Sequence, residues 1–148
     1  MIIFVLVNLG KFKNMTSQII YKGELRTKAT HLQSNTVIET DAPTDNQGKG
    51  ERFSPTDLMA TSLGNCMITI MGIKARDMNI DLTDTKIDIT KIMKAEPRRV
   101  GGIKVAFHFP SSLQLDDKQK TILENAARTC PVAKSIHPDI EQDISFNW

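Results

Sequence analysis

The pattern of apolar and polar positions predicts strands at both ends of the chain. Residues 18–40 contain runs of β-branched residues separated by turn-like breaks, which predicts short strands joined as a hairpin or meander. Residues 78–93 and 101–109 predict a second pair of strands, and in the later one apolar side chains alternate with polar ones. The alternation in residues 144–148 predicts a closing strand.

A helical period appears in the middle of the chain. Residues 41–52, rich in Gly, Asn and Pro, predict a long loop, and residues 54–57 (SPTD) predict a helix start with an N-cap serine followed by proline. The apolar residues that then recur in steps of three and four are Met59, Leu63, Cys66, Ile70 and Ile73. They predict a helix of about 20 residues with Cys66 on the face toward the core or a partner subunit. Gly64 and Gly72 weaken a helix interior, which predicts close backbone packing there.

A second helix is predicted to begin at an Asp116 cap and to reach Cys130. Pro131 interrupts it, and residues 131–136 predict a new short helix with proline at its first position. Cys130 then lies at or next to an N-cap, where the helix dipole and nearby amides are expected to lower the pKa of its thiol. The predicted order β-β-α-β-β-α-α-β describes an α+β domain.

The composition and charge exclude some classes of protein. The chain has 148 residues, 40% of them hydrophobic, and a net charge of +2 from 19 basic and 17 acidic residues that are interspersed. Such a balance is not that of a nucleic-acid-binding protein. The basic cluster from Lys91 to Arg99 is interrupted by Glu96, and we interpret it as solvated surface.

The apolar N-terminal segment could be mistaken for a targeting signal. Residues 1–10 have no basic region before them and no small-residue cleavage site after them, and they are too short to span a bilayer. Because Met15 opens a natural first strand, we interpret residues 1–14 as an extension outside the core and residues 15–148 as one domain. We therefore expect a cytoplasmic protein with no membrane partner.

The cysteines and histidines lack metal-site spacing. The two cysteines, Cys66 and Cys130, do not form a CxxC pair, and two such thiols alone are typical of inert core residues. The histidines, His31, His108 and His137, have no ligand spacing with each other or with the cysteines. We therefore expect neither a metal site nor a bound cofactor.

Two segments nevertheless resemble the OsmC/Ohr family of organic-hydroperoxide reductases. FSPTDLMATSLGNCM, at 53–67, resembles the first-helix motif of that family, which leads to a reactive cysteine. ENAARTCPVAKSI, at 124–136, resembles its second motif, in which Cys-Pro-Val follows a helix. The order of the motifs and the separation of their cysteines also fit, and the resemblance runs from about Tyr21 to the C-terminus.

The resemblance implies an OsmC-like fold, in which antiparallel sheets pack around two central helices in an intertwined homodimer. It also implies a cysteine-based peroxidase that reduces organic hydroperoxides or hydrogen peroxide. Cys66 would be the peroxidatic thiol and Cys130 the resolving thiol, so that a sulfenic acid on the first condenses with the second to a disulfide. A cellular dithiol, for example one of the lipoyl type, would then regenerate the enzyme.

A thiolate on an apolar helix face needs a cation nearby. The family supplies an arginine from its N-terminal strands, and Arg26 lies at about the corresponding place. Arg52, in the loop before the central helix, is the second candidate. The alternative for either residue is a plain surface arginine.

One position departs from the family pattern. Where the peroxidases carry a glutamate ten residues before the reactive cysteine, this chain has Thr56. Asp57 and Glu51 are close enough in sequence for a carboxylate to reach the arginine from a shifted position, although Asp57 also suits a capping box. The substitution leaves open an alternative function: an OsmC-like dimer that binds a small apolar ligand or senses redox state with little turnover. A structural domain with two buried cysteines is the third interpretation.

Overall fold

The computed structural model describes residues 14–148, which fall into two compact units, 14–55 and 56–148. The predicted extension at 1–14 lies outside the described residues except for Asn14. The interpretation of 15–148 as one domain stays a prediction.

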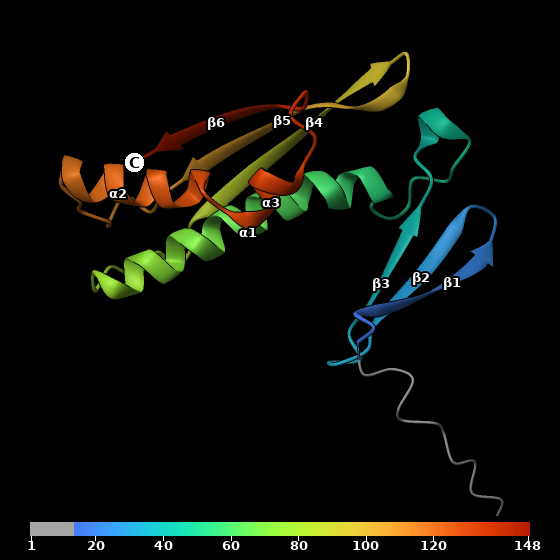
Figure 1. The fold of residues 1–148 in the computed structure, drawn as a ribbon, viewed down its shortest axis with the longest axis horizontal. Coiled ribbons are helices and arrows are strands. Elements are labelled where there is room, and N and C mark those ends of the chain that lie inside the picture. Colours follow the sequence, from blue (N-terminus) through green and yellow to red (C-terminus); the bar gives the residue numbers. More distant parts are fainter. Residues whose placement is uncertain (1–13) are drawn as a thin grey trace, which may run out of the picture. The chain divides into compact units, whose positions relative to one another are not determined.

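The first unit is a three-stranded antiparallel meander, in the order β1-β2-β3 (Figure 1). Its strands are β1 (Ser17–Gly23), β2 (Arg26–His31) and β3 (Val37–Asp41). The predicted meander is confirmed, with three strands where the predicted order had two. The loop predicted at 41–52 is also present, and it contains the short 3-10 helix η1 (Thr44–Asn46).

The sheet of the first unit has no apolar interior of its own. Ile19 and Tyr21 on β1 are 66% and 65% exposed, and Ile38 on β3 is 48% exposed. Within residues 14–55, the buried side chains are the polar ones of Thr40, Asp41 and Ser54. Because apolar burial is the main force that stabilises a sheet, this meander needs a covering surface.

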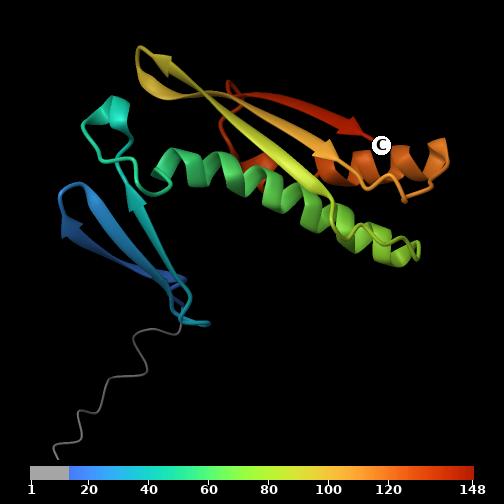
Figure 2. The ribbon, with the colours of Figure 1, turned by 180° about the vertical axis from the view of Figure 1, so that it is seen from behind.

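The second unit is a three-stranded sheet with its helices on one face, as Figures 1 and 2 show from opposite sides. Its elements, in chain order, are α1 (Pro55–Asp77), β4 (Lys86–Ala95), β5 (Arg98–His108), α2 (Asp117–Arg128), α3 (Pro131–Ser135) and β6 (Glu141–Asn147). The α+β prediction is therefore confirmed.

The sheet of the second unit is mixed. Strands β4 and β5 are antiparallel, but β5 and β6 are parallel. The expectation of purely antiparallel sheets is wrong here because the chain crosses over through α2 and α3, so that β6 enters the sheet in the same direction as β5.

The core lies between this sheet and α1. On β5 the alternating residues Ile103, Val105 and Phe107 are fully buried, as their pattern predicts. The buried stripe of α1 consists of Ala60, Leu63, Met67, Met71 and Ala75. Of the predicted stripe, Leu63 is fully buried, and Met59, Cys66 and Ile70 are partly buried and pack against the core. Ile73 is 47% exposed and lies outside it.

Helix α1 is long and apolar enough to cross a membrane by length and composition alone. The core helices of soluble proteins commonly meet the same criterion. In this unit the buried stripe of α1 is part of the hydrophobic core, which accounts for its apolar composition.

Close packing explains one of the two helix glycines. A Cβ on Gly64 would lie 2.6 Å from Cδ1 of Ile89 on β4, so no larger residue fits without a shift. A Cβ on Gly72 would meet nothing within 4 Å. The prediction of close backbone packing is right for Gly64 and wrong for Gly72.

The hairpin of β4 and β5 is displaced from its predicted bounds. Residues 78–85 are turns, because Asn79 and Asp84 have φ of 55° and 66° and the Asp81 carboxylate accepts the Thr83 amide at 2.9 Å. At the other end, β5 begins at Arg98, three residues before the predicted start of the strand at 101.

The helix caps at the C-terminal end agree with the sequence. The Asp116 carboxylate accepts the Gln119 amide, and the Gln119 side chain in turn accepts the Asp116 amide, which forms a capping box. Cys130 is the N-cap of α3, and Pro131 is its first residue. After β6, the Trp148 ring stacks on Phe109 with 3.8 Å between centroids.

Candidate active site

The two cysteines lie together in the second unit. Cys66 is in the middle of α1 and is partly buried, whereas Cys130, the N-cap of α3, is fully buried. Both are free thiols, and their side chains lie close enough for Cys66 to raise the pKa of Cys130. The fold thus brings together two sulfurs that stand at positions 66 and 130 of the chain.

Burial controls the ionisation of Cys130. It raises the pKa of the thiol, and the contact with Cys66 raises it further. The amides of Ala133 and Val132 act in the opposite direction, and the Ala133 amide donates to the Cys130 Sγ at 3.3 Å. The prediction that the helix dipole lowers the pKa of Cys130 is wrong, because burial outweighs the amides of this short helix.

Arg26 is held by two carboxylates within the first unit. Its Nε and Nη2 donate to the two oxygens of Asp41 at 2.6 and 2.8 Å, and Nη2 also donates to Glu51 Oε2 at 2.7 Å. Asp41 is 2% exposed and lies opposite Arg26 in the β2–β3 register. The carboxylates raise the pKa of Arg26, and the guanidinium lowers the pKa of Asp41.

A carboxylate therefore reaches Arg26 from the loop, as the sequence suggested for Glu51. Arg52, the second candidate, lies at the surface: its Nε is 3.3 Å from Glu39 Oε2, and its Nη1 donates to the Glu51 carbonyl at 2.9 Å. The support of Cys66 by either arginine stays a prediction, since both arginines belong to the first unit and Cys66 to the second.

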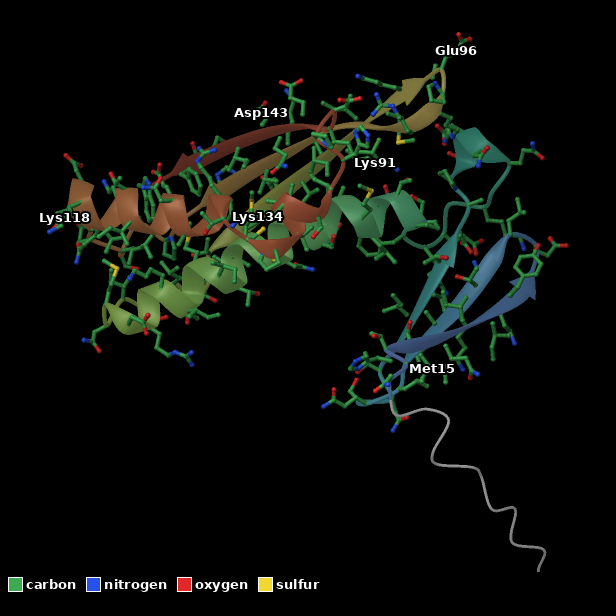
Figure 3. All side chains as sticks on the ribbon, in the orientation of Figure 1. Met15, Lys91, Glu96, Lys118, Lys134 and Asp143 are labelled. Carbon is green, nitrogen blue, oxygen red and sulfur yellow. The ribbon has the colours of Figure 1, made fainter. Side chains whose placement is uncertain are left out.

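Thr56, which stands where the family pattern has a glutamate, is in contact with a lysine. Nζ of Lys91 donates to Thr56 Oγ1 at 2.9 Å and lies 2.7 Å from Asp57 Oδ1. Figure 3 shows Lys91 on the helix side of the sheet, between β4 and the first turns of α1, with Asp143 on the opposite side. The Lys91 side chain is only 18% exposed, so its assignment to a solvated surface is wrong.

Sequence reasoning missed Lys91 and Asp41. A signal for Lys91 was available, because Ile87, Ile89 and Met93 alternate with polar residues on β4 and place Lys91 on the same covered face. For Asp41, no pattern distinguishes a buried carboxylate from the polar loop that follows it. Its role depends on the register of β2 and β3, which the sequence does not specify.

Within residues 14–148, no group of three or more His, Cys, Asp or Glu side chains is placed to hold a metal ion. The histidines are instead engaged locally. His108 Nε2 lies 3.0 Å from Asp88 Oδ2 on the neighbouring strand, and His31 Nδ1 contacts Ser34 Oγ at 2.7 Å.

A mixed sheet covered by a long central helix, with one thiol on that helix and another at the cap of a short helix, defines a thiol-bearing α+β protein. Residues 48–145 match the family described as OsmC-like protein. The chain belongs to the OsmC-like family, as the two cysteine motifs predicted.

Solved structures share this fold. A protein from Psychrobacter arcticus, named as a candidate osmotic stress induced and detoxification response protein, is 59% identical, with a TM-score of 0.86 over 90% of this chain and 96% of that one. The organic hydroperoxide resistance protein OsmC of Legionella pneumophila is 17% identical, with a TM-score of 0.70 over 91% and 98%. OhrB of Bacillus subtilis, also an organic hydroperoxide resistance protein, is 17% identical, with a TM-score of 0.60 over 90% and 98%. No curated protein matches the chain.

Proposed function

We propose that the protein is a cysteine-based peroxidase that reduces organic hydroperoxides or hydrogen peroxide, with Cys66 as the attacking thiol and Cys130 as the resolving thiol. The observation that carries this proposal is the proximity of the two side chains, which is close enough for Cys66 to raise the pKa of Cys130. Two thiols in contact need little movement to form a disulfide, whose Cα atoms lie within about 7 Å of each other.

The exposure of the two thiols supports this division of roles. Cys66 is partly exposed, so a peroxide can approach its sulfur, whereas Cys130 is 0% exposed. The raised pKa of Cys130 keeps it protonated near neutral pH, which suits a group that reacts second. The reverse assignment would require a peroxide to reach a buried, protonated thiol.

The reaction then has three balanced steps. The Cys66 thiolate attacks one peroxide oxygen, the O–O bond breaks, and the departing alkoxide takes a proton to leave as an alcohol, or as water from hydrogen peroxide. The sulfenic acid on Cys66 condenses with the Cys130 thiol to give a disulfide and water. A cellular dithiol, for example one of the lipoyl type, reduces the disulfide and is itself oxidised.

The arginine is the other part of the proposal. Arg26 is already oriented by Asp41 and Glu51, and a guanidinium held in this way suits a thiolate and a peroxide oxygen. Thr56 replaces the family glutamate, so Glu51 takes over the orientation of Arg26 from the loop. Arg52 is the alternative cation, and its exposed position makes it the natural control.

We also propose that the chain works as a soluble cytoplasmic homodimer. The exposed apolar residues Ile19, Tyr21 and Ile38 leave the first unit without cover, and a second copy of the chain supplies a matching surface. Light scattering at micromolar concentration gives twice the 16.6 kDa chain mass if this is right, and the monomer mass if it is wrong.

The names of the structural relatives also support the peroxidase proposal, since two are organic hydroperoxide resistance proteins and a third is a candidate detoxification response protein.

The test of the peroxidase proposal is to mix the reduced protein with cumene hydroperoxide, tert-butyl hydroperoxide and hydrogen peroxide and to count free thiols. We expect rapid loss of both thiols with one disulfide per chain, and no disulfide in Cys66→Ser. Thiols that survive millimolar peroxide contradict the proposal.

The arginines are tested in the same assay. Arg26→Ala is expected to slow thiol loss by about tenfold or more, whereas Arg52→Ala leaves it nearly unchanged. Circular dichroism of each variant shows whether it is folded. If folded Arg26→Ala reacts at the wild-type rate, the arginine assignment is wrong.

A further inference from the structure

A cavity of about 440 Å³ lies in the second unit, away from the thiol pair. The first turns of α1, the start of β5 and the segment between α3 and β6 line it, and it is open to solvent on one side. Apart from Thr56, the residues that line it are Met59, Arg99, Val100, His137, Asp139 and Ile140. Its volume is in the range of sites that hold a small organic molecule.

The walls of the cavity are apolar. Val100 and Ile140 are only 4% and 7% exposed, and Met59 packs against the core from the first turns of α1. Met59 precedes Cys66 by seven residues, which is about 10 Å along a helix at 1.5 Å per residue. A small molecule seated against Met59 is therefore separated from the sulfurs by about two helical turns.

The guanidinium of Arg99, which has unused hydrogen-bond donors, lies at the edge of the cavity. Arg99 Nη2 lies 3.8 Å from Asp139 Oδ2, too long for a hydrogen bond, and this is the only ion pair that the structure gives Arg99 among residues 14–148. The Arg99 side chain is 34% exposed. A guanidinium carries five N–H donors in a planar fork that matches a carboxylate.

A histidine adds a neutral donor to the same edge. The Asp139 amide donates to His137 Nδ1 at 3.1 Å. In the neutral ring this bond leaves the proton on Nε2, so His137 offers an N–H there. The Asp139 carboxylate is 63% exposed and lies 3.7 Å from His137 Nδ1. It is therefore near both Arg99 and His137, but at neither distance does it form a hydrogen bond.

We propose that this cavity is a binding site for a small carboxylate with a short apolar chain, whose chain lies on Met59, Val100 and Ile140 and whose carboxylate pairs with Arg99 and His137. The apolar walls favour a hydrocarbon portion, and the loosely paired guanidinium favours a planar anion over a cation or a neutral head. No thiol takes part, so the site goes beyond the proposed peroxidase chemistry and stands or falls independently of it.

The two charges at the edge of the cavity are expected to affect ligand binding in opposite directions. Arg99 attracts the ligand carboxylate, and Asp139 repels it and competes for Arg99. Arg99→Met therefore weakens binding, by about tenfold or more, since a hydrogen bond to a charged group is worth roughly 1.5–3 kcal/mol. Asp139→Asn strengthens binding, because it removes a negative charge and keeps the size of the side chain.

The experiment uses the full chain as Cys66→Ser, which removes peroxide chemistry but keeps the cavity. Octanoate is titrated while the ¹³C methyl resonance of Met59 is followed, with the resonance assigned from Met59→Leu. Octanol and octylamine, which have the same chain and a neutral or positive head, are the ligand controls. Lys104→Met is the protein control, because it removes one positive charge from the same strand at a side chain that is 56% exposed and does not line the cavity.

We expect a saturable shift of the Met59 methyl with octanoate, weaker binding in Arg99→Met, tighter binding in Asp139→Asn and no change in Lys104→Met. Octanol and octylamine are expected to bind at least tenfold more weakly than octanoate. Absence of a saturable shift, as when another copy of the chain covers the cavity, overturns the proposal. Equal binding of all three ligands, or loss of binding in Lys104→Met as large as in Arg99→Met, overturns it as well.

Discussion

Nζ of Lys91 lies 2.7 Å from Oδ1 of Asp57, on a face of β4 that is otherwise apolar. The lysine is mostly covered and stands at the first turn of α1, where the helix dipole is positive. A cation there is unfavourable unless a carboxylate neutralises it. Asp57 is that carboxylate, in the part of α1 where the family carries its glutamate.

The two partners should therefore differ in importance for stability. Asp57→Asn leaves a mostly covered cation at the positive end of a helix, and we expect it to lower the free energy of unfolding by about 1–3 kcal/mol. Lys91→Met leaves a partly exposed carboxylate at a favourable helix position and adds apolar contact, so its effect is expected to stay within about 1 kcal/mol. Urea denaturation measures both; a larger loss in Lys91→Met contradicts this view of the pair.

The glycines of α1 provide a matched pair of substitutions. Gly64→Ala places a methyl 2.6 Å from Ile89 Cδ1, and we expect the overpacking to cost about 1–3 kcal/mol of unfolding free energy. Gly72→Ala has open space around its Cβ and is expected to stabilise the helix by about 0.5–1 kcal/mol. Ile89→Val, which removes Cδ1, should recover part of the loss in Gly64→Ala but not change Gly72→Ala. Equal melting temperatures for the two alanine variants would contradict the observed packing.

The raised pKa of Cys130 predicts a loss of stability at alkaline pH. The unfolded chain releases this proton near the usual thiol pKa of 9.0, whereas the folded protein still holds it, so the contribution is complete below pH 9.0 and is lost as pH rises through the folded pKa. Urea unfolding of the reduced protein should show a steeper decline above pH 9.0 in the wild type than in Cys130→Ala. If the stability of the wild type and of Cys130→Ala falls equally above pH 9.0, burial does not raise the pKa of Cys130.

The salt bridge of Arg26 should matter for stability independently of catalysis. Arg26→Met leaves the Asp41 carboxylate, 2% exposed, without its cation, and we expect a clear loss of unfolding free energy. The double variant Arg26→Met/Asp41→Leu should recover much of that loss, because no unpaired charge remains buried. Because Arg26 lowers the pKa of Asp41, its contribution is present above pH 3.8 and is lost as pH falls through the lowered value. Thermal unfolding from pH 2 to 7 tests both statements.

The sequence predicted the elements whose signals are local. The helix start at Pro55, the Asp116 capping box and the Cys130 cap depend on neighbouring residues, and each is found where its motif stands. The buried face of β5 followed from strict alternation of apolar residues. The family motifs further identified both cysteines of the candidate site.

The features that the sequence did not reveal depend on contacts between distant segments. The parallel pairing of β6 with β5 follows from the crossover, and the burial of Lys91 follows from α1 lying over β4. The predicted stripe of α1 lies at the margin of the fully buried face, because Met, Ile and Leu occur all around the helix and periodicity alone does not find the centre of that face. The pKa of Cys130 was misjudged because its burial is a property of the packed core.

The cap of α3 has a consequence for how oxidation is detected. The Ala133 amide donates to the sulfur of Cys130, in a helix of only five residues. A helix this short has few other bonds to hold its first turn. A disulfide to Cys66 pulls the Cys130 sulfur away from the Ala133 amide. Exchange of the Ala133 amide hydrogen with solvent should therefore report whether Cys130 is oxidised, without any chemical label.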